Sequence, residues 1–168
     1  MKELNWYMFD QNNSGGSFVV NDKLCHRLFI EAESFNDAVE KAEDLGCYWD
    51  GVHNGRDCPC CGDRWSQYED LIDIEKYKTE GYTVSLYDGI WSDTRGEWED
   101  KYRKYGVVEE PKFETRGTIR SYIGKIRFNN IEEYAQYLAN EYGWTAPDGR
   151  IFYNDGSVKE IFSDNPRY

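Results

Sequence analysis

The sequence has only two histidines, His26 and His53, and it lacks the common catalytic motifs. No G-x-S-x-G elbow, no G-x-x-x-x-G-K-[ST] phosphate loop and no G-x-G-x-x-G stretch is present. Both histidines stand near cysteines, so a histidine that acted as a general base would compete with metal ligation. Carboxylates are abundant, but nothing in their positions singles out one catalytic pair. We therefore expect a binding protein rather than an enzyme.

Long apolar segments are also missing. No run approaches the roughly 20 residues that a helix needs to cross a bilayer. The first residues, MKELNWYMFDQ, are charged and polar where a signal peptide would have its apolar stretch. We therefore expect no membrane segment and a cytoplasmic location. In such a reducing compartment, the five cysteines favour metal binding or redox chemistry over disulfides.

Aromatic residues, by contrast, are plentiful. They make up 17% of the sequence although the hydrophobic fraction is only 39%. Aromatic side chains bury large areas and disordered chains contain few of them, so this composition indicates a folded protein. A chain of 168 residues can form one domain with a sizeable core, or two small lobes. We expect a single domain over residues 1–168.

The hydrophobic pattern predicts an α+β fold, a mainly antiparallel sheet with two principal amphipathic helices and a zinc-knuckle-like loop. The helices are expected at 34–46, where Ser34 is a good N-cap and Gly46 a good end, and at 129–144. Strands are expected at 4–10, 23–32, 82–89 and 118–128, hairpins at 4–20 and 150–162, a short helix within 68–81, a helix at 96–106 and a connection at 107–117.

A weak internal repeat accompanies these elements. Residues 27–51 and 124–149 each combine a strand, an amphipathic helix and an ending with glycine, an aromatic residue and Asp-Gly. Duplication of one ancestral strand-helix unit would explain the similarity. Two ordinary amphipathic helices would also explain it, and we favour that explanation.

Charge is distributed unevenly along the chain. The formal net charge of -12 opposes direct binding to nucleic acid or to an anionic membrane. Residues 31–50 carry seven acidic residues against one lysine, whereas residues 101–128 carry eight basic residues against three acidic ones. Solubility alone can account for charged surfaces of this kind. Two functional alternatives remain, one for each sign of charge.

The acidic surface can imitate a phosphate backbone and occupy the basic groove of a protein that handles nucleic acid. The acidic residues expected to contact such a partner are Glu40, Glu43, Asp44, Asp93, Glu97 and Asp100. The basic strip can instead bind a phosphate-bearing nucleotide, with a ring stacked on the base. The residues expected in that site are Arg103, Lys104, Arg116, Arg120 and Tyr122.

The stretch RDCPCCGDRW, residues 56–65, lies in a predicted cysteine-rich loop over 47–65. Cys58 and Cys61 have the C-x-x-C-G order in which a tight turn lets two thiolates converge on one zinc ion. A structural zinc site has four ligands, and proximity favours the set Cys47, His53, Cys58 and Cys61, with Cys60 or His26 as substitutes. Reduced structural cysteines and a redox pair are the alternatives to zinc.

Arg64 and Trp65 have a structural interpretation in the same stretch. The indole can cover the loop, and the guanidinium can hold Asp57 or Asp63. The motif from Asp57 to Trp65, D-C-P-C-C-G-D-R-W, resembles that of a group of small, uncharacterised tailed-bacteriophage proteins with a D-C-x-C-C-G-D-R-W-like stretch. The resemblance implies a phage origin and a host-cell cytoplasmic location, and it implies no biochemical activity.

A phage origin adds a class of partner to the charge pattern. Small acidic phage proteins often inhibit a host enzyme or defence system. We therefore expect a phage-encoded inhibitor that contacts a host defence or nucleic-acid-processing complex, through protein–protein contact and mimicry of nucleic acid. A sponge for a phosphate-bearing nucleotide signal is the first alternative, and an enzyme of unknown type is the second.

Overall fold

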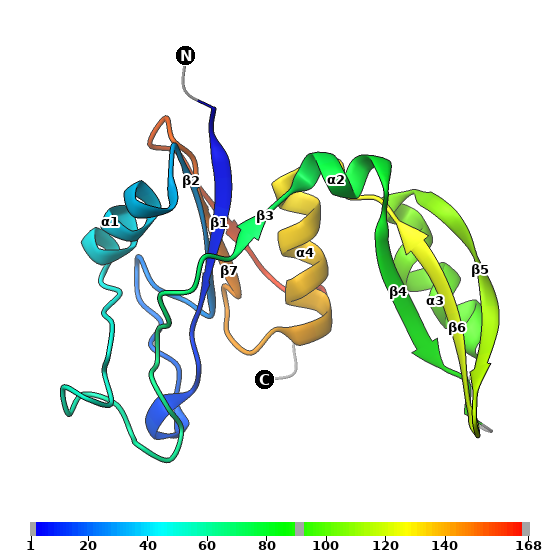
Figure 1. Cartoon of the computed structure of the whole chain (residues 1–168), viewed down its shortest axis with the longest axis horizontal. Coiled ribbons are helices and arrows are strands. Elements are labelled where there is room, and N and C mark those ends of the chain that lie inside the picture. Colours follow the sequence, from blue (N-terminus) through cyan, green and yellow to red (C-terminus); the bar gives the residue numbers. More distant parts are fainter. Residues whose placement is uncertain (1–2, 90–92, 166–168) are drawn as a thin grey trace. The chain divides into compact units, whose positions relative to one another are not determined.

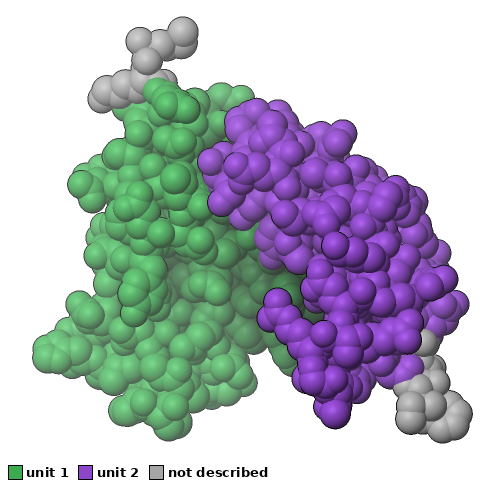
Figure 2. Space-filling view, turned by 45° about the vertical axis from the view of Figure 1, so that its right-hand side comes forward, with its two compact units in different colours: residues 1–72, 134–168 green, residues 73–133 purple. Residues whose placement is uncertain are grey.

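A computed structural model of the protein describes residues 3–89 and 93–165. The chain divides into two compact units, which Figure 2 distinguishes by colour. Unit 1 comprises residues 1–72 and 134–168, and unit 2 comprises residues 73–133. The single domain expected over residues 1–168 stays a prediction.

Unit 1 contains a five-stranded sheet in the order β3-β1-β2-β7-β8. Its elements are β1 (Asn5–Asp10), η1 (Ser14–Gly16), β2 (Arg27–Ala32), α1 (Phe35–Leu45), β3 (Leu71–Ile72), β7 (Gly149–Phe152) and β8 (Val158–Ile161). Helix α4 (Ile131–Tyr142) begins in the last residues of unit 2 and continues in unit 1. β2 and β7 are parallel, and the other neighbouring strands are antiparallel. The expected α+β fold with a mainly antiparallel sheet is confirmed.

The central strand β2 is buried on both faces because a helix covers each of them. Leu28 and Ile30 pack in one core cluster with Ala38 of α1. Phe29 points to the opposite face, where its ring lies 6.3 Å from the ring of Tyr134 in α4. Figure 1 accordingly shows α1 and α4 on either side of the sheet. Because side chains alternate between the two faces of a strand, β2 contributes apolar residues both to the core under α1 and to the core under α4.

Helix α1 begins and ends where its sequence predicts. The Ser34 hydroxyl accepts a hydrogen bond from the backbone N–H of Asp37 at 3.1 Å. Gly46 ends the helix with φ of 120°, a conformation that other residues rarely adopt, and donates its N–H to the Glu43 carbonyl at 3.0 Å. The two caps fix the length of the helix and hence the direction of its polar face.

Unit 2 contains an antiparallel sheet in the order β4-β6-β5 with a helix against it. Its elements are α2 (Ile74–Thr79), β4 (Tyr82–Tyr87), α3 (Thr94–Tyr102), η2 (Arg103–Tyr105), β5 (Val107–Arg116) and β6 (Ile119–Ile126). Trp98 of α3 is fully buried and donates its indole N–H to the Val84 carbonyl at 3.3 Å. A Cβ atom on Gly124 would lie 2.7 Å from the Trp98 ring. The glycine therefore lets the indole pack directly on β6.

Two expected elements differ from the structure, and the expected repeat spans two sheets. Residues 107–117 were expected to form a connection, but most of them form β5. Pairing with β6 supplies hydrogen bonds to the backbone of β5, and the register of the two strands shifts between Val107 and Lys112. The hairpin at 4–20 is wrong, because β1 pairs with β2 and β3 while residues 18–20 form no strand. The repeated strands lie in different sheets, β2 in the first and β6 in the second, and common ancestry stays a prediction.

None of the helices within residues 3–89 and 93–165 has the length and apolar character that a membrane crossing requires.

Candidate metal centre and charged surfaces

Three cysteines of the 56–65 stretch lie together at the surface of unit 1. The Sγ atoms of Cys58, Cys60 and Cys61 all lie within 4.8 Å of one another, close enough to bind one metal ion. The backbone N–H groups of Cys61 and Gly62 both donate to the Cys58 carbonyl at 3.1 Å, which makes the turn. Gly62 has φ of 86°, so a glycine is needed there. Cys58 is half-buried and the other two cysteines are exposed.

Hydrogen bonding within the cluster separates the acidities of its thiols. The Cys60 side chain lowers the pKa of Cys58. The same interaction with Cys58, together with that of Cys61, raises the pKa of Cys60 to about 11. Of these two thiols, Cys58 therefore ionises first, while Cys60 keeps its proton and donates it. Because a thiolate is the metal-binding form of cysteine, Cys58 is the natural first ligand.

Side chains far apart in the sequence hold this loop in place. The backbone N–H of Cys58 donates to the Ser14 hydroxyl at 2.9 Å. The Asn12 side chain donates to the carbonyls of Cys61 at 2.9 Å and Asp63 at 2.8 Å. Asp57, whose side chain is 1% exposed, accepts a hydrogen bond from the Tyr48 hydroxyl at 2.5 Å. The loop shape therefore comes from hydrogen bonds that use no sulfur atom.

Arg64 connects the cysteine loop to the segment 11–17. Its guanidinium donates to the carbonyls of Ser14 and Ser17, each at 2.7 Å, and to the Gln11 side chain at 3.0 Å. Its Nε lies 3.9 Å from the Asp57 carboxylate, so the expected pairing of these two residues is present as a long ion pair. Trp65 follows it and is 1% exposed. Both residues are therefore part of the scaffold of the loop.

The other ligands expected from the sequence lie outside this cluster. Cys47 is 5% exposed in the core of unit 1, where burial raises its thiol pKa to about 12. His53 is exposed. Neither belongs to a group of three metal-ligating side chains within the described ranges, and the four-residue set with Cys58 and Cys61 stays a prediction. His26, a possible substitute, is buried with its Nδ1 2.8 Å from the Asp148 carboxylate.

The acidic residues expected on α1 form an open face. Glu40, Glu43 and Asp44 are all exposed. Positions separated by three or four residues lie on one side of a helix, so Glu40 shares a side with the other two. No basic side chain within the described ranges forms an ion pair with any of the three. Within the described ranges, these three carboxylates are therefore open to a basic partner.

The acidic residues expected around α3 have local roles. Asp93 caps the helix by accepting a hydrogen bond from the Gly96 N–H at 3.1 Å. Glu97 forms an ion pair with Lys101 at 3.2 Å. Asp100 is exposed. Two of these three carboxylates therefore already have a structural partner in the chain.

The residues expected in a nucleotide site do not form a free basic cluster. Arg103 donates to the carboxylates of Glu99 and Glu110, and these hydrogen bonds lower the pKa of both acids. Arg120 forms an ion pair with Asp88 at 3.0 Å and lies over the ring of Phe113. Of the remaining expected residues, Lys104 lies over the Tyr105 ring and Arg116 is exposed. The ring of Tyr122 contacts that of Phe113.

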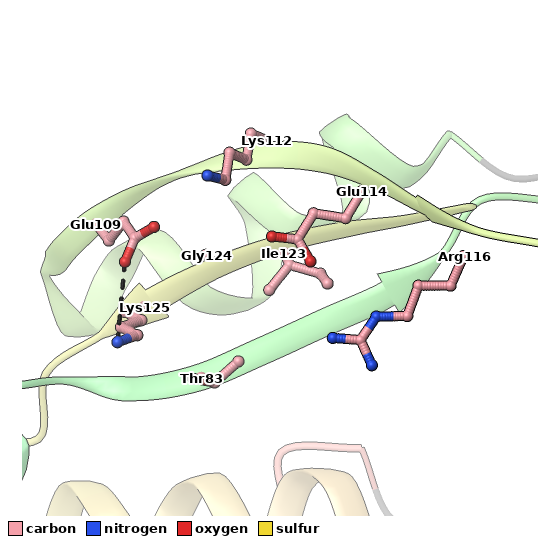
Figure 3. A pocket seen from close by; sticks show the side chains of 8 residues that line it. All are labelled: Thr83, Glu109, Lys112, Glu114, Arg116, Ile123, Gly124 and Lys125. Atoms are coloured by element: carbon pink, nitrogen blue, oxygen red, sulfur yellow. Dashed lines mark ion pairs between the residues drawn. The ribbon is translucent and has the colours of Figure 1, made fainter. Parts of the chain in front are cut away.

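A cavity of about 340 Å³ lies on the surface of the three-stranded sheet (Figure 3). Its lining includes three basic residues, Lys112, Arg116 and Lys125, and two acidic ones, Glu109 and Glu114. Lys125 forms an ion pair with Glu109 at 3.9 Å. Figure 3 shows the guanidinium of Arg116 extending from β5 over β4. Of the expected nucleotide-binding residues, Arg116 alone is among the residues that line this cavity.

Comparison with known families assigns the chain to one family. A family model described as a domain of unknown function, DUF7296, matches residues 4–125, which is well over half of the chain. The chain belongs to the DUF7296 family. No curated protein and no solved structure matches it. The family description gives no activity, and the phage origin implied by the D-C-x-C-C-G-D-R-W-like stretch stays a prediction.

The DUF7296 match covers the elements that build the candidate sites. It includes α1 with its acidic face, the cysteine loop, α3 and most of the three-stranded sheet. It ends within β6, so α4, β7 and β8 lie beyond it. The sheet of unit 1 therefore combines strands from inside and outside the matched region. The cysteine cluster and its scaffold lie entirely inside it.

Sequence patterns missed two polar features of unit 1. The first is a buried carboxylate, Asp148, which lies 2.7 Å from Arg27 and 2.8 Å from His26 and accepts the N–H of Trp144 at 2.9 Å. The second is a small cavity beside the cysteine loop, lined in part by Trp49. Residues from distant positions meet at the first site, so no local motif indicates it. For the second site, the sequence offers only the aromatic and acidic residues that precede and follow the cysteines, such as Trp49 and Asp63.

Proposed function

We propose that this DUF7296 protein acts by binding, as a phage-encoded inhibitor in the host cytoplasm. It places its acidic surface in the basic groove of a host defence or nucleic-acid-processing complex, where the carboxylates stand in for phosphate groups. The single observation that carries the proposal is the unpaired acidic face of α1, formed by Glu40, Glu43 and Asp44. No catalytic step is part of this function.

The acidic face is costly for the helix that carries it. Glu43 and Asp44 lie in the last turn of α1, and no basic residue accompanies them there. Negative charge near a helix C-terminus opposes the helix dipole, typically at a cost of about 0.3–1 kcal/mol for each charge. Carboxylates three or four residues apart also repel one another. A basic partner surface would offset both effects, which supports a binding role for this face.

The basic strip supports the alternative function less well. Arg103 and Arg120 are each held by carboxylates of the same chain, as described above. A phosphate group would have to compete with those carboxylates for the same guanidinium donors. The α1 carboxylates face no such competition within the described residues. The difference in internal pairing favours the acidic surface as the contact surface.

The nucleotide sponge keeps one specific observation in its favour, the cavity in Figure 3. Lys112, Arg116 and Lys125 line it together and could receive a phosphate group. In that case the site uses Arg116 with two lysines in place of Arg103, Lys104 and Arg120. Calorimetry with cyclic and ADP-ribose-type nucleotides tests this second candidate. Submicromolar binding that is lost in Arg116→Ala would replace the first proposal.

We also propose that the metal at Cys58, Cys60 and Cys61 is zinc and that its role is structural. Soft thiolate ligands select metals such as zinc, and three cysteines approach the four ligands of a structural site. The fourth ligand would come from outside the cluster, and His53 or Cys47 is the prediction from the sequence. The metal would tighten a loop whose hydrogen bonds already define its shape. It would carry no part of the proposed inhibition.

The test of the inhibitor proposal is a capture experiment from bacterial host lysate with matched variants. The test variant Glu40→Gln, Glu43→Gln, Asp44→Asn neutralises the α1 face. The control variant Glu3→Gln, Asp22→Asn, Glu69→Gln removes the same amount of charge from exposed positions elsewhere in unit 1.

We expect the wild-type protein and the control to retain one stoichiometric partner. The partner should be a nucleic-acid-binding protein that elutes with rising salt, because charge pairs weaken when salt screens them. The test variant should lose it. Retention of the partner by the test variant, or elution that does not depend on salt, would overturn the proposal.

A further inference from the structure

A cavity of about 210 Å³ lies beside the cysteine loop in unit 1. Its lining includes Trp49, Asp50, Asp63, Ser66, Gln67 and Tyr68. We propose that this cavity binds a guanidinium group, such as the side chain of an arginine. The proposal goes beyond the inhibitor function, because it uses neither the α1 carboxylates nor the metal cluster. It concerns a ligand of a defined chemical class that the isolated protein can be tested for.

The charge of the cavity is negative and uncompensated. Its two carboxylates, Asp50 and Asp63, face no basic residue in the lining. The nearest arginines in the sequence have other contacts: Arg56 lies 3.6 Å from the centre of the Tyr48 ring, and Arg64 donates to the segment 11–17. Among the described lining residues no cation competes with an incoming one for the two acids, so a cationic ligand is favoured there.

The two carboxylates are held in different ways. One oxygen of Asp63 accepts the backbone N–H of Val52 at 2.9 Å, which orients the side chain and leaves its other oxygen for a ligand. Asp50 has φ of 55° and is the one residue other than glycine with positive φ among the described residues. That backbone conformation costs free energy for most side chains, and aspartate and asparagine tolerate it best. The loop therefore presents Asp50 from a defined position.

The aromatic residues select a planar cation over a compact one. Trp49 and Tyr68 line the cavity, and Tyr68 is 79% exposed, so its ring is free to stack on a ligand. A guanidinium group stacks on aromatic rings while its N–H groups point outward in its own plane. Those donors match the carboxylates of Asp50 and Asp63 and the amide oxygen of Gln67. An ammonium group is a compact and strongly hydrated charge without a flat face, so it would bind the carboxylates but would not stack on the rings in the same way.

The tryptophans of the lining are packed into the fold. The indole nitrogens of Trp49 and Trp65 are buried and have no hydrogen-bond partner within the described residues. Because these two atoms are buried, a ligand in the cavity reaches them only if the side chains move. The proposal therefore rests on the two carboxylates and on the exposed ring of Tyr68.

The test measures binding of small probes to the purified full-length protein by tryptophan fluorescence and calorimetry. The probes are Nα-acetyl-arginine amide, its citrulline counterpart, which lacks the charge, and methylguanidine, which lacks the carbonyls. We expect binding of the arginine compound and at least about tenfold weaker binding of the citrulline compound, which corresponds to about 1.4 kcal/mol. Tighter binding of the arginine compound than of methylguanidine identifies the peptide as the source of the cation.

Variants locate the site without disrupting the fold. Asp50→Asn keeps a residue that tolerates positive φ, and Asp63→Asn keeps the oxygen that accepts the Val52 N–H. Each variant should weaken binding about fivefold or more, and the exposed Tyr68→Leu should weaken it as well. Asp22→Asn, an exposed position outside the lining, is the matched control and should change nothing.

Equal affinity for the arginine and citrulline compounds would overturn the proposal. So would affinity for the arginine compound that survives both Asp50→Asn and Asp63→Asn, or the absence of any binding by a protein whose circular dichroism is native. These outcomes are independent of the inhibitor proposal, because no host protein takes part. A protein that binds the arginine compound but captures no host partner would support the cavity and contradict the inhibitor function.

Discussion

The Asp57 carboxylate accepts a hydrogen bond from the backbone N–H of Arg64 at 2.8 Å. This contact joins the two ends of the segment that contains Cys58, Cys60 and Cys61. The other oxygen of Asp57 accepts the Tyr48 hydroxyl, and the whole carboxylate is buried. A buried acid therefore closes the cysteine loop, in addition to the hydrogen bonds from Asn12 and Ser14.

Removal of the Asp57 carboxylate should destabilise unit 1. Asp57→Ala leaves the hydroxyl of Tyr48 and the N–H of Arg64 without their acceptor. We expect the free energy of unfolding to fall by about 2–4 kcal/mol, as for loss of a buried, hydrogen-bonded charge. Urea denaturation measures it, with Asp22→Ala, an exposed acid outside the helices, as the control expected within about 0.5 kcal/mol. A loss no larger than that of the control would contradict the role of Asp57.

Titration with Co²⁺ should distinguish the ligands of the metal centre. Thiolate ligands produce charge-transfer absorption whose intensity rises with their number. We expect one ion per chain, and we expect Cys60→Ser to lose about a third of that absorption because Cys60 belongs to the cluster of three.

The same titration of His53→Ala and Cys47→Ala tests the set predicted from the sequence. If His53 completes the site, its removal weakens binding while the thiolate absorption persists. Cys47 is buried in the core, so Cys47→Ala should leave the absorption unchanged. Loss of thiolate absorption in Cys47→Ala with full absorption in Cys60→Ser would show that the four-residue set is right and that the observed cluster is not the site.

Alkaline pH should lower the stability of the fold through Cys47. Burial raises the pKa of the Cys47 thiol from 9.0 to about 12. Between these values the unfolded chain releases a proton that the folded chain keeps, so the free energy of unfolding falls as pH rises. The slope approaches about 1.4 kcal/mol per pH unit for one such group.

Urea denaturation between about pH 8 and pH 11 measures this slope. Cys47→Ala should show a shallower decrease than the wild-type protein, whatever its stability at neutral pH. Parallel curves for the wild-type protein and Cys47→Ala would be incompatible with a protonated, buried Cys47.

The buried network around Asp148 should also carry a large share of the stability of unit 1. Asp148→Ala leaves the Arg27 guanidinium buried without its acid, and frees the N–H of Trp144. Breaking a buried charge pair from one side typically costs about 3–5 kcal/mol. In thermal denaturation, Asp148→Ala should have a much lower midpoint than the control variant Asp164→Ala, which removes an exposed acid near the same end of the chain. Equal midpoints would contradict the network's role.

Local patterns predicted most elements of the fold. The periodic apolar residues of α1 and α4, the Ser34 cap and the Gly46 end depend on neighbours within a few positions, so their sequence is sufficient evidence. β5 was missed because its residues alternate poorly and its register shifts against β6. The 4–20 hairpin was wrong because Arg64, from far along the chain, holds residues 11–17 in a loop.

The sequence by itself determined the α+β composition, the two principal helices, the acidic face of α1 and the closeness of Cys58, Cys60 and Cys61 along the chain, whereas the predicted ligand set took Cys47 and His53 with Cys58 and Cys61. Each of these follows from residues that are neighbours along the chain or one helix turn apart. The tertiary structure alone decided which strands pair, that Cys47 is buried in the core and that Asp57 and Asp148 are buried among hydrogen-bond donors. Those outcomes depend on contacts between residues tens of positions apart, where burial and pairing are settled by how the elements pack rather than by any local pattern.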